Sequence, residues 1–428
     1  MNAARDTDVI VIGAGLAGLG AAHRLRQRGL RCVVLEAADR IGGRAWTAHP
    51  PELDGAWFDM GAVWLHAAEH NPLVPIAEAT GETLLRADAL RQELTFVGDR
   101  PAREAELAAY AGAWDRFEAA TDRLIGRHGD VPLAAVTAAL PDDPWAPTVE
   151  AWEGPVICVA DADRFSARDW RRNALSGSNL VPEGGIGAFV ARRLGDGLDI
   201  RLGTPVQRLR WNGPGGAVTA ETARGAVTAG ACIVTVSTGV LASGALRFEP
   251  DLPETVQACV AALPMGLAMK VVLRATGADR LDLPPHCSID RQVPASGGVL
   301  MPFQCWPFGR DWVQGWIGGT PAWELARAGD AAAVDFALAQ LRSLFGSRVD
   351  RVFAGGARLV THWEADPWVR GAYCYARPGE AEARDRLAQP QGDGHLCFAG
   401  EACNVPYAGT LAGAWLSGQE AAAQVVVD

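Results

Sequence analysis

The stretch D-V-I-V-I-G-A-G-L-A-G, residues 8–18, decides the fold of this chain. Its β-branched run is typical of a buried parallel strand, and a G-x-G-x-x-G turn and a helix-like segment follow directly. We expect Gly13 to make the tight turn, Gly15 to let the backbone approach a pyrophosphate, and Gly18 to let the helix pack on the strand. The positive end of the helix then faces the pyrophosphate. The stretch therefore predicts a dinucleotide-binding site.

The next strand and its loop indicate which dinucleotide binds. A second predicted strand, residues 31–35, ends on Glu36, whose carboxylate can accept hydrogen bonds from the adenosine ribose hydroxyls. The loop D-R-I-G-G-R follows at residues 39–44. Its glycine pair lets the backbone approach phosphates and its arginines supply positive charge; the residues concerned are Arg40, Gly43 and Arg44. The alternative is a surface loop with two incidental arginines. Beside Glu36, the loop favours FAD over NAD.

Composition and charge narrow the class of protein. The 428 residues suffice for two lobes, and the hydrophobic and charged fractions, 49% and 21%, are ordinary for a soluble globular protein. The net charge of −11 argues against a nucleic-acid partner and favours cationic small molecules, although acidity also simply keeps a protein soluble. No apolar run is long enough for a membrane span, and residues 1–6 lack the apolar segment of a secretion signal. We therefore expect a cytoplasmic protein without membrane contact.

The cysteines do not form a recognisable framework. There are nine, an odd number, and none lies in a C-x-x-C pair. This pattern is typical of reduced cytosolic thiols and predicts neither disulfides nor a metal site.

Further motifs follow in order along nearly the whole chain. They are F-D-M-G-A-V-W-L-H at 58–66 with N-P at 71–72, E-G-G at 183–185, T-P-V at 204–206, V-T-V-S-T-G-V-L at 234–241, M-G-L-A-M-K at 265–270, W-E-A-D-P-W at 363–368, G-A-Y-C-Y at 371–375, F-A-G-E at 398–401, Y-A-G-T at 407–410 and G-A-W-L-S-G at 413–418. With residues 9–44, they resemble the flavin amine oxidase family of monoamine oxidases, polyamine oxidases and lysine-specific histone demethylases. The motifs are closest to those of polyamine oxidases.

This resemblance implies an α/β fold with two interleaved domains. A Rossmann-type FAD-binding domain, of the glutathione-reductase and amine-oxidase type, would take residues 1–72, 183–262 and 391–428. An α+β substrate-binding domain would take residues 73–182 and 263–390. On its own pattern, the first of these two segments is mostly helical, while the second alternates short apolar runs with turns and suits a sheet that roofs the flavin.

Lys270 is the first candidate catalytic residue. It lies in the hydrophobic run 265–273, where an unpaired lysine is costly to bury. The resemblance matches it to the family lysine that holds a water near flavin N5. The alternative is a lysine that extends from a sheet edge into solvent.

Tyr373, Thr410 and Trp415 would shape the substrate pocket. By resemblance, Tyr373 is the aromatic wall beside the flavin ring, although a tyrosine there could also simply pack in the core. Thr410 stands where monoamine oxidases have a second wall tyrosine, so we expect the two-tyrosine arrangement to be absent. Trp415, about one helical turn further on, is expected to refill part of that space.

His66 and Trp64 belong to the same expected pocket. The resemblance places His66 at the substrate entrance, as in polyamine oxidases, although a lone histidine is often structural. Trp64 stands where L-amino-acid oxidases have a carboxylate-binding arginine. Because an indole cannot form a bidentate pair with a carboxylate, Trp64 argues against an amino-acid substrate.

The resemblance also implies cofactor contacts beyond the N-terminal region. They are Gly61, Ala62, Val63, Trp64, Val206, Trp363, Gly400, Glu401, Gly409 and Thr410. Val206 would hold the adenine through its backbone, and Glu401 would contact the ribityl or phosphate region, or else only interact with a helix dipole. We expect non-covalent FAD, because Ala372 stands where monoamine oxidases have the flavin-bonded cysteine, with Cys374 on the far side of Tyr373.

The expected activity is oxidation of an amine by hydride transfer from its α-carbon to flavin N5. The imine product would hydrolyse to an aldehyde or ketone, and O2 would be reduced to H2O2. The substrate would be a polyamine or a small primary or secondary amine, with Glu69, Asp161 and Asp163 as candidate acidic contacts. The alternatives are oxidation of an amino acid or biosynthetic intermediate, and a non-catalytic FAD-binding scaffold. No pattern indicates an oligomeric state.

Overall fold

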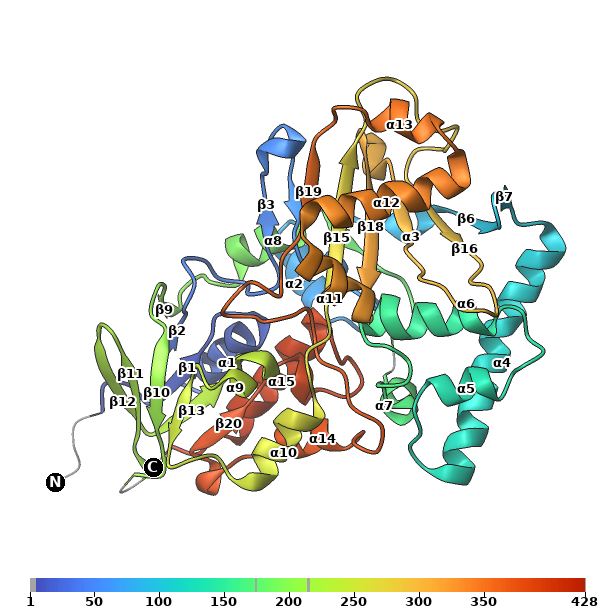
Figure 1. Cartoon of the computed structure of the whole chain (residues 1–428). Coiled ribbons are helices and arrows are strands. Elements are labelled where there is room, and N and C mark those ends of the chain that lie inside the picture. Colours follow the sequence, from blue (N-terminus) through green and yellow to red (C-terminus); the bar gives the residue numbers. More distant parts are fainter. Residues whose placement is uncertain (1–4, 174, 214–215, 428) are drawn as a thin grey trace.

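The computed structural model of the protein describes residues 5–173, 175–213 and 216–427. Figure 1 shows a parallel sheet with its helices at the lower left, a larger sheet at the top and a helical region at the lower right. The chain passes between these regions several times, so both sheets are built from segments distant in the sequence.

A five-stranded parallel sheet forms the centre of the first region, in the order β20-β13-β1-β2-β9. The strands are β1 (Val9–Ile12), β2 (Cys32–Leu35), β9 (Asp199–Arg201), β13 (Ala231–Val234) and β20 (Leu396–Phe398). Val9 lies opposite both Cys32 and Ala231, and every residue of β1 is buried, as expected for a central strand covered on both faces. The α/β class expected from the sequence is confirmed.

Helix α1 (Leu16–Gln27) begins directly after the glycine turn and packs against α15 (Leu411–Gln424). Gly13 has a φ of 104°, which side-chain-bearing residues rarely adopt. A Cβ atom on Gly18 would lie 1.8 Å from the carbonyl oxygen of Gly13. The start of α1 therefore approaches β1 as closely as the sequence pattern predicted.

A seven-stranded sheet, in the order β19-β15-β18-β17-β16-β6-β7, forms the second region. Its strands are β6 (Gln92–Val97), β7 (Arg100–Pro101), β15 (Ala268–Arg274), β16 (Cys287–Arg291), β17 (Phe303–Cys305), β18 (Trp312–Gly318) and β19 (Arg358–Val360). In Figure 1, α11 (Gly319–Ala328), α12 (Asp330–Phe345) and α13 (Arg348–Phe353) cover its outer side. Met269 and Val271 pack into this covered core, so Lys270 points to the opposite face.

The third region is helical and comes from the chain between the first two. Its helices are α4 (Glu104–His128), α5 (Ala134–Ala138), α6 (Ala146–Ala151) and α7 (Ala167–Arg172). A π-helix, Trp152–Cys158, continues α6 and contains Pro155. The sequence pattern predicted that residues 73–182 are mostly helical. In the structure, β6 and β7 from this segment join the seven-stranded sheet, with β6 parallel to β16.

The remaining elements surround these three regions. They are α2 (Leu73–Ala79), α3 (Ala87–Leu90), α8 (Ile186–Arg193), α9 (Thr238–Ser243), α10 (Glu254–Ala262), α14 (Ala383–Leu387), β3 (Thr47–Ala48), β4 (Phe58–Asp59), β5 (Leu84–Leu85), β8 (Val181–Pro182), β10 (Val206–Arg210), β11 (Val218–Thr222), β12 (Gly225–Ala229) and β14 (Arg247–Glu249). Helix α14 packs against α10 beside the parallel sheet, although the sequence grouped its residues with the substrate-binding segments.

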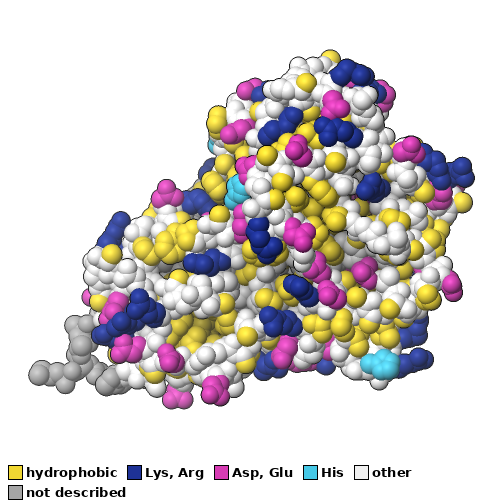
Figure 2. Space-filling view, viewed as in Figure 1, with side chains coloured by type: hydrophobic (Ala, Val, Ile, Leu, Met, Phe, Trp, Pro, Cys, Tyr) yellow, Lys and Arg dark blue, Asp and Glu magenta, His cyan; other side chains and the backbone are white. Residues whose placement is uncertain are grey.

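Several absences hold for the part of the chain that the structure describes. No helix there is long and apolar enough to cross a membrane. Its nine cysteines are all free thiols, and no cluster of His, Cys, Asp and Glu could hold a metal ion. On the face shown in Figure 2, acidic and basic side chains are interspersed and form no single-sign surface.

We predict that Gly18→Ala lowers the free energy of unfolding by at least about 2 kcal/mol, because the added methyl group must displace the Gly13 carbonyl. Gly126→Ala is the matched control, since Gly126 is an exposed residue inside α4 with nothing near its added Cβ. The control should stabilise the protein by about 0.5–1 kcal/mol. Urea unfolding of both variants measures the difference, and equal effects would contradict the close packing of α1 on β1.

Candidate active site

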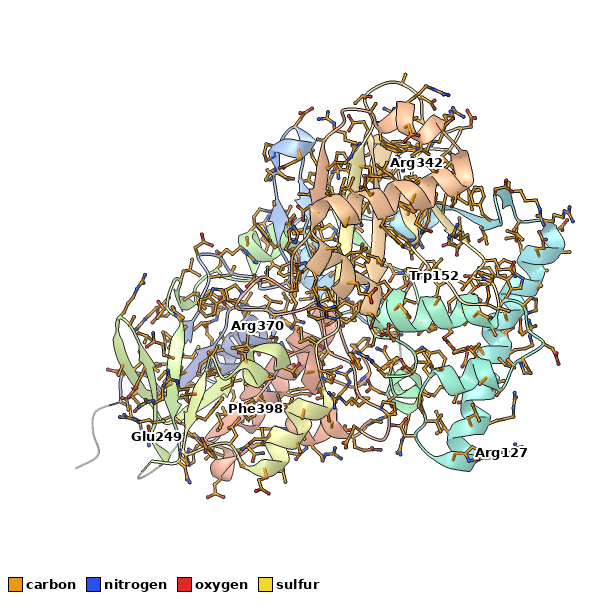
Figure 3. All side chains as sticks on the ribbon, viewed as in Figure 1. Arg127, Trp152, Glu249, Arg342, Arg370 and Phe398 are labelled. Carbon is orange, nitrogen blue, oxygen red and sulfur yellow. The ribbon has the colours of Figure 1, made fainter. Side chains whose placement is uncertain are left out.

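A cavity of about 1030 Å³ lies where the three regions meet. One end is lined by the glycine turn, the start of α1 and Glu36, and the other by the inner face of the seven-stranded sheet and the π-helix. Figure 3 labels Trp152, one of the lining residues, where the helical region meets that sheet. The cavity is thus long enough to join a dinucleotide site to a chamber under the sheet.

The first end of the cavity fits a dinucleotide. A Cβ atom on Gly15 would meet no protein atom within 4 Å, so this glycine leaves open the space in front of the helix start. The N-terminal N–H groups of α1 lack intrahelical partners there and can bind a diphosphate. Glu36, which is 8% exposed, accepts hydrogen bonds from the backbone N–H of Ala14 at 2.5 Å and of Ala38 at 2.8 Å. Burial raises the pKa of this carboxyl group.

The loop after Glu36 brings two arginines to the same wall. Arg40 donates to the carbonyl oxygen of Gly43 at 2.7 Å, and its guanidinium lies 4.6 Å from the centre of the Trp46 ring. Arg44 donates to Glu401 at 2.9 Å. Both arginines line the cavity and can approach phosphate groups, with the charge of Arg44 partly offset by Glu401.

Lys270 is buried where the sheet meets the dinucleotide end, with 2% of its surface exposed. Its Nζ donates to the carbonyl oxygens of Asp59 and Gly61, both at 2.6 Å, and lies 5.9 Å from the centre of the Trp316 ring. Burial lowers its pKa to about 8. It is also the only lysine in the chain, since every other residue among the 39 of Lys and Arg is arginine.

The segment that Lys270 holds carries predicted cofactor contacts. The indole of Trp363 donates to the carbonyl oxygen of Met60 at 3.0 Å, between the two carbonyls that accept from Lys270. A Cβ atom on Gly61 would lie 2.1 Å from the carbonyl oxygen of Arg44, so the segment also packs tightly on the arginine loop. The carbonyl groups of Asp59, Met60 and Gly61 are thus fixed by the side chains of Lys270 and Trp363.

Tyr373 and Thr410 lie on neighbouring walls. The Tyr373 hydroxyl donates to the carbonyl oxygen of Ile157 at 2.5 Å, and burial raises its pKa, so the ring is fixed as a neutral phenol. The Thr410 side chain caps α15 by accepting from the N–H of Gly413 at 3.0 Å. Thr410 therefore lines the cavity while it also starts the helix.

A buried network supports Tyr373 from behind. The thiol of Cys374 donates to Glu401 at 3.3 Å and lies 3.2 Å from a guanidinium nitrogen of Arg384. Arg384 in turn donates to Asp169 through Nε at 2.8 Å and Nη2 at 2.9 Å. Arg384 and Asp169 are 2% and 3% exposed, and burial raises the pKa of the Cys374 thiol. Cys374 lines the cavity, and its thiol is held between the Glu401 carboxylate and the Arg384 guanidinium.

His66 and Trp64 both line the cavity. The imidazole of His66 is hydrogen-bonded to Asn179 at 2.7 Å, and burial lowers its pKa, which favours a neutral ring. The guanidinium of Arg91 lies 5.7 Å from the centre of the Trp64 ring. A guanidinium thus lies beside Trp64, although the Trp64 indole itself cannot pair with a carboxylate.

Most residues predicted from the sequence line this cavity. They are Gly13, Gly15, Glu36, Arg40, Gly43, Arg44, Gly61, Ala62, Val63, Trp64, His66, Val206, Lys270, Trp363, Tyr373, Gly400, Glu401, Gly409 and Thr410. Gly18 is not in the lining and instead packs on Gly13.

Trp415 requires a correction. It is 3% exposed, lies outside the cavity lining and packs against the ring of His23 at 5.5 Å between centroids. Five residues separate it from Thr410, which turns its side chain about 140° around α15, away from the chamber. It therefore fills the contact between α1 and α15 and does not refill the substrate pocket.

The three acidic candidates also lie outside the lining. The exposed Glu69 binds Ser178, and Asp161 binds Thr320. The lining also contains acids that the sequence did not indicate, namely Glu118, Glu153, Asp169 and Asp366. Glu153 lies on the π-helix and accepts from the indole of Trp170 at 2.7 Å. Burial raises the pKa of Glu153 to about 7.

The π-helix and the Asp169–Arg384 pair were not found from the sequence. The π-helix presents the carbonyl oxygens of Val156 and Ile157 to Trp316 and Tyr373. The only local signal is a proline inside a helical segment, and sequence spacing does not show that Asp169 meets Arg384.

A cavity of this build, with a dinucleotide site at one end and a roofed chamber at the other, is typical of an oxidoreductase that binds a dinucleotide cofactor. The chain belongs to the family of flavin containing amine oxidoreductases, whose family model matches residues 16–426. FAD is therefore its cofactor, and the glycine turn, Glu36 and the two loop arginines fit that group.

Individual relatives agree with this assignment. Polyamine oxidase 4 of Oryza sativa subsp. japonica is 28% identical over 443 residues, which cover 97% of this chain and 87% of that protein. Lysine-specific histone demethylase 2 of Homo sapiens is 28% identical over 457 residues, which cover 97% of this chain and 53% of that protein. The solved structure of putrescine oxidase bound to putrescine has the same fold, with a TM-score of 0.80 at 21% identity, covering 97% of this chain and 98% of that one.

We predict that Lys270 titrates with a pKa of about 8, because its burial disfavours the ammonium form. Protein labelled with ¹³C at lysine Cε should give one side-chain signal, since the chain has a single lysine. That signal should shift through a midpoint near pH 8 and vanish in Lys270→Arg. A midpoint above pH 10 would show that the amine is solvated and would contradict its burial.

Proposed function

We propose that this protein oxidises a polyamine or a small primary or secondary amine at the carbon next to nitrogen, with O2 as electron acceptor. FAD, when bound, supplies the chemistry by accepting a hydride from that carbon and returning two electrons to O2 as H2O2. The observation that carries the proposal is Lys270, the sole lysine, buried with a lowered pKa beside both ends of the cavity.

The residues of the chamber support amine chemistry in three ways. Tyr373 offers a neutral aromatic face, fixed through Ile157, against which an alkylamine can lie. Trp316 and Ala268 make the roof beside Lys270 apolar, which limits the water around the reacting carbon. Lys270 keeps one N–H, or its lone pair when deprotonated, beyond its two carbonyl bonds, and can hold a water in the chamber.

The proposal extends to the attachment of FAD, which we infer is non-covalent. Ala372 precedes Tyr373 and has no nucleophile, and its carbonyl oxygen accepts from Arg44 at 2.7 Å. The Cys374 thiol lies between Glu401 and Arg384, and its raised pKa keeps it protonated. Neither neighbour of Tyr373 therefore supplies a thiolate for a bond to FAD.

We predict that Lys270→Met lowers turnover by about 100-fold or more while FAD stays bound, because methionine fills the space but holds neither a proton nor a water. A peroxide-coupled assay on the purified yellow protein measures the change. The panel contains spermine, spermidine, putrescine, benzylamine, phenylethylamine, tryptamine, cyclohexylamine and the common L-amino acids.

Arg327→Met is the control, since Arg327 lies in the last turn of α11 outside the cavity lining, and it should keep full activity. Wild-type rates retained in Lys270→Met would contradict the role given to the lysine. FAD bound without turnover of any amine would contradict the proposed function.

A further inference from the structure

Three polar side chains form a row on the cavity face of the seven-stranded sheet. Gln314 on β18 lies directly opposite Gln304 on β17, and Gln304 lies opposite Ser288 on β16. Residues opposite each other share a face of the sheet. Gln314 is two residues from Trp316, which is paired with Lys270, so the row faces the same side as the lysine. We call Ser288, Gln304 and Gln314 the polar row.

The polar row has no partner of its own. All three side chains are partly exposed and line the cavity. Among the residues that the structure describes, none of their side chains makes a hydrogen bond. Other polar groups in the lining differ: Asp169 and Glu401 are paired with arginines, and Glu153 accepts from Trp170. Two carboxamides and a hydroxyl in a partly apolar chamber are therefore available to a ligand.

A guanidinium stands at the outer end of the row. Arg91 immediately precedes β6, two residues before Glu93, which is opposite Ser288. Arg91 lines the cavity, and its Nε is buried without a hydrogen-bond partner. One terminal nitrogen donates to Glu93 at 3.0 Å, but that carboxylate is 72% exposed and outside the lining, so the charge of Arg91 is only partly offset.

We propose that the polar row and Arg91 form a subsite for a carbonyl or carboxylate oxygen carried by the amine substrate. The inference rests on the proposed function and names the substrate's second recognition group. Each glutamine has two N–H donors and serine has one O–H, while Arg91 keeps its Nε–H beyond its bond to Glu93. Neighbouring members of this set can therefore donate together to the oxygen of one carbonyl or carboxylate group. Glu93 lies opposite Ser288, but it is exposed, outside the cavity lining and already paired with Arg91. The acids that do line the cavity belong to its dinucleotide end and to the helical region, so a second ammonium group would meet no lining carboxylate at the polar row.

The spacing of the strands sets the size of the group that would fit. Neighbouring strands lie about 4.8 Å apart, so the row extends roughly 10 Å from the Gln314 strand to the Ser288 strand. Gln314 lies on the strand next to that of Lys270. If the carbon that is oxidised lies near Lys270, a chain of several bonds must separate it from the carbonyl or carboxylate oxygen that binds the polar row.

Four amines that share an aminoalkyl end test the subsite. They are N-acetylputrescine, which ends in a carboxamide, 5-aminopentanoate, which ends in a carboxylate, heptylamine, which ends in a methyl group, and 1,5-diaminopentane, which ends in an ammonium. Binding of each to the oxidised holoenzyme is followed by the change in flavin absorbance, so no turnover is needed. We expect at least one oxygen-bearing probe to bind about tenfold or more tightly than heptylamine.

Gln304→Met and Gln314→Met remove the donors and keep the length of the side chain. Each should weaken the preferred oxygen-bearing probe about five- to tenfold and leave heptylamine and the diamine unchanged. Gln257→Met is the matched control, because Gln257 lies exposed on α10 and donates to the carbonyl oxygen of Leu252 at 2.7 Å. It should bind all four probes as the wild type does.

Arg91→Met distinguishes a subsite for a carboxylate from a subsite for a carboxamide. A larger loss for 5-aminopentanoate than for N-acetylputrescine assigns the subsite to carboxylates, and the reverse assigns it to carboxamides. The proposal is overturned if the oxygen-bearing probes bind no tighter than heptylamine, or if the glutamine variants weaken all probes equally or only the diamine. Absence of turnover with any amine would instead refute the proposed function, which these binding measurements do not require.

Discussion

The structure depends on one buried amine that joins the two halves of the site. Lys270 extends from the centre of the seven-stranded sheet and donates to two carbonyls of the segment that lines the dinucleotide end. Burying a lysine is costly unless its protons are satisfied, so the sheet and the segment must keep a fixed distance. Trp363 adds a third bond to the carbonyl between them. All other Lys or Arg positions in the chain are arginine, whereas position 270 is lysine, whose compact ammonium group has a pKa that shifts readily on burial.

The parallel sheet was predictable because its signals are local. The run before Gly13, the three spaced glycines and the acid at the end of the next strand lie within about 30 residues, and each has one steric or hydrogen-bonding reason. The seven-stranded sheet was only partly predictable. The apolar runs of β15 and β18 indicated strands, but β6 lies in a helix-rich segment and is held as a strand by its pairing with β16, nearly 200 residues away.

The residues of the candidate site were likewise only partly predictable from the sequence. Residues in motifs, such as Lys270, Tyr373 and Glu401, could be placed in one cavity from the family resemblance. Trp415 was misplaced because its position depends on how far α15 turns past Thr410. Side chains that meet only through folding, such as Asp169 with Arg384 or the polar row, leave no sequence signal, since strand register brings their positions together.

The central claim is that an amine held in the chamber reduces FAD bound at the glycine turn. The most direct measurement is anaerobic mixing of the purified yellow holoenzyme with each amine, followed by flavin absorbance. The account predicts that at least one amine bleaches the flavin to its two-electron-reduced form and that admitting O2 restores the colour and releases one equivalent of H2O2. A flavin that stays oxidised with every amine would contradict it.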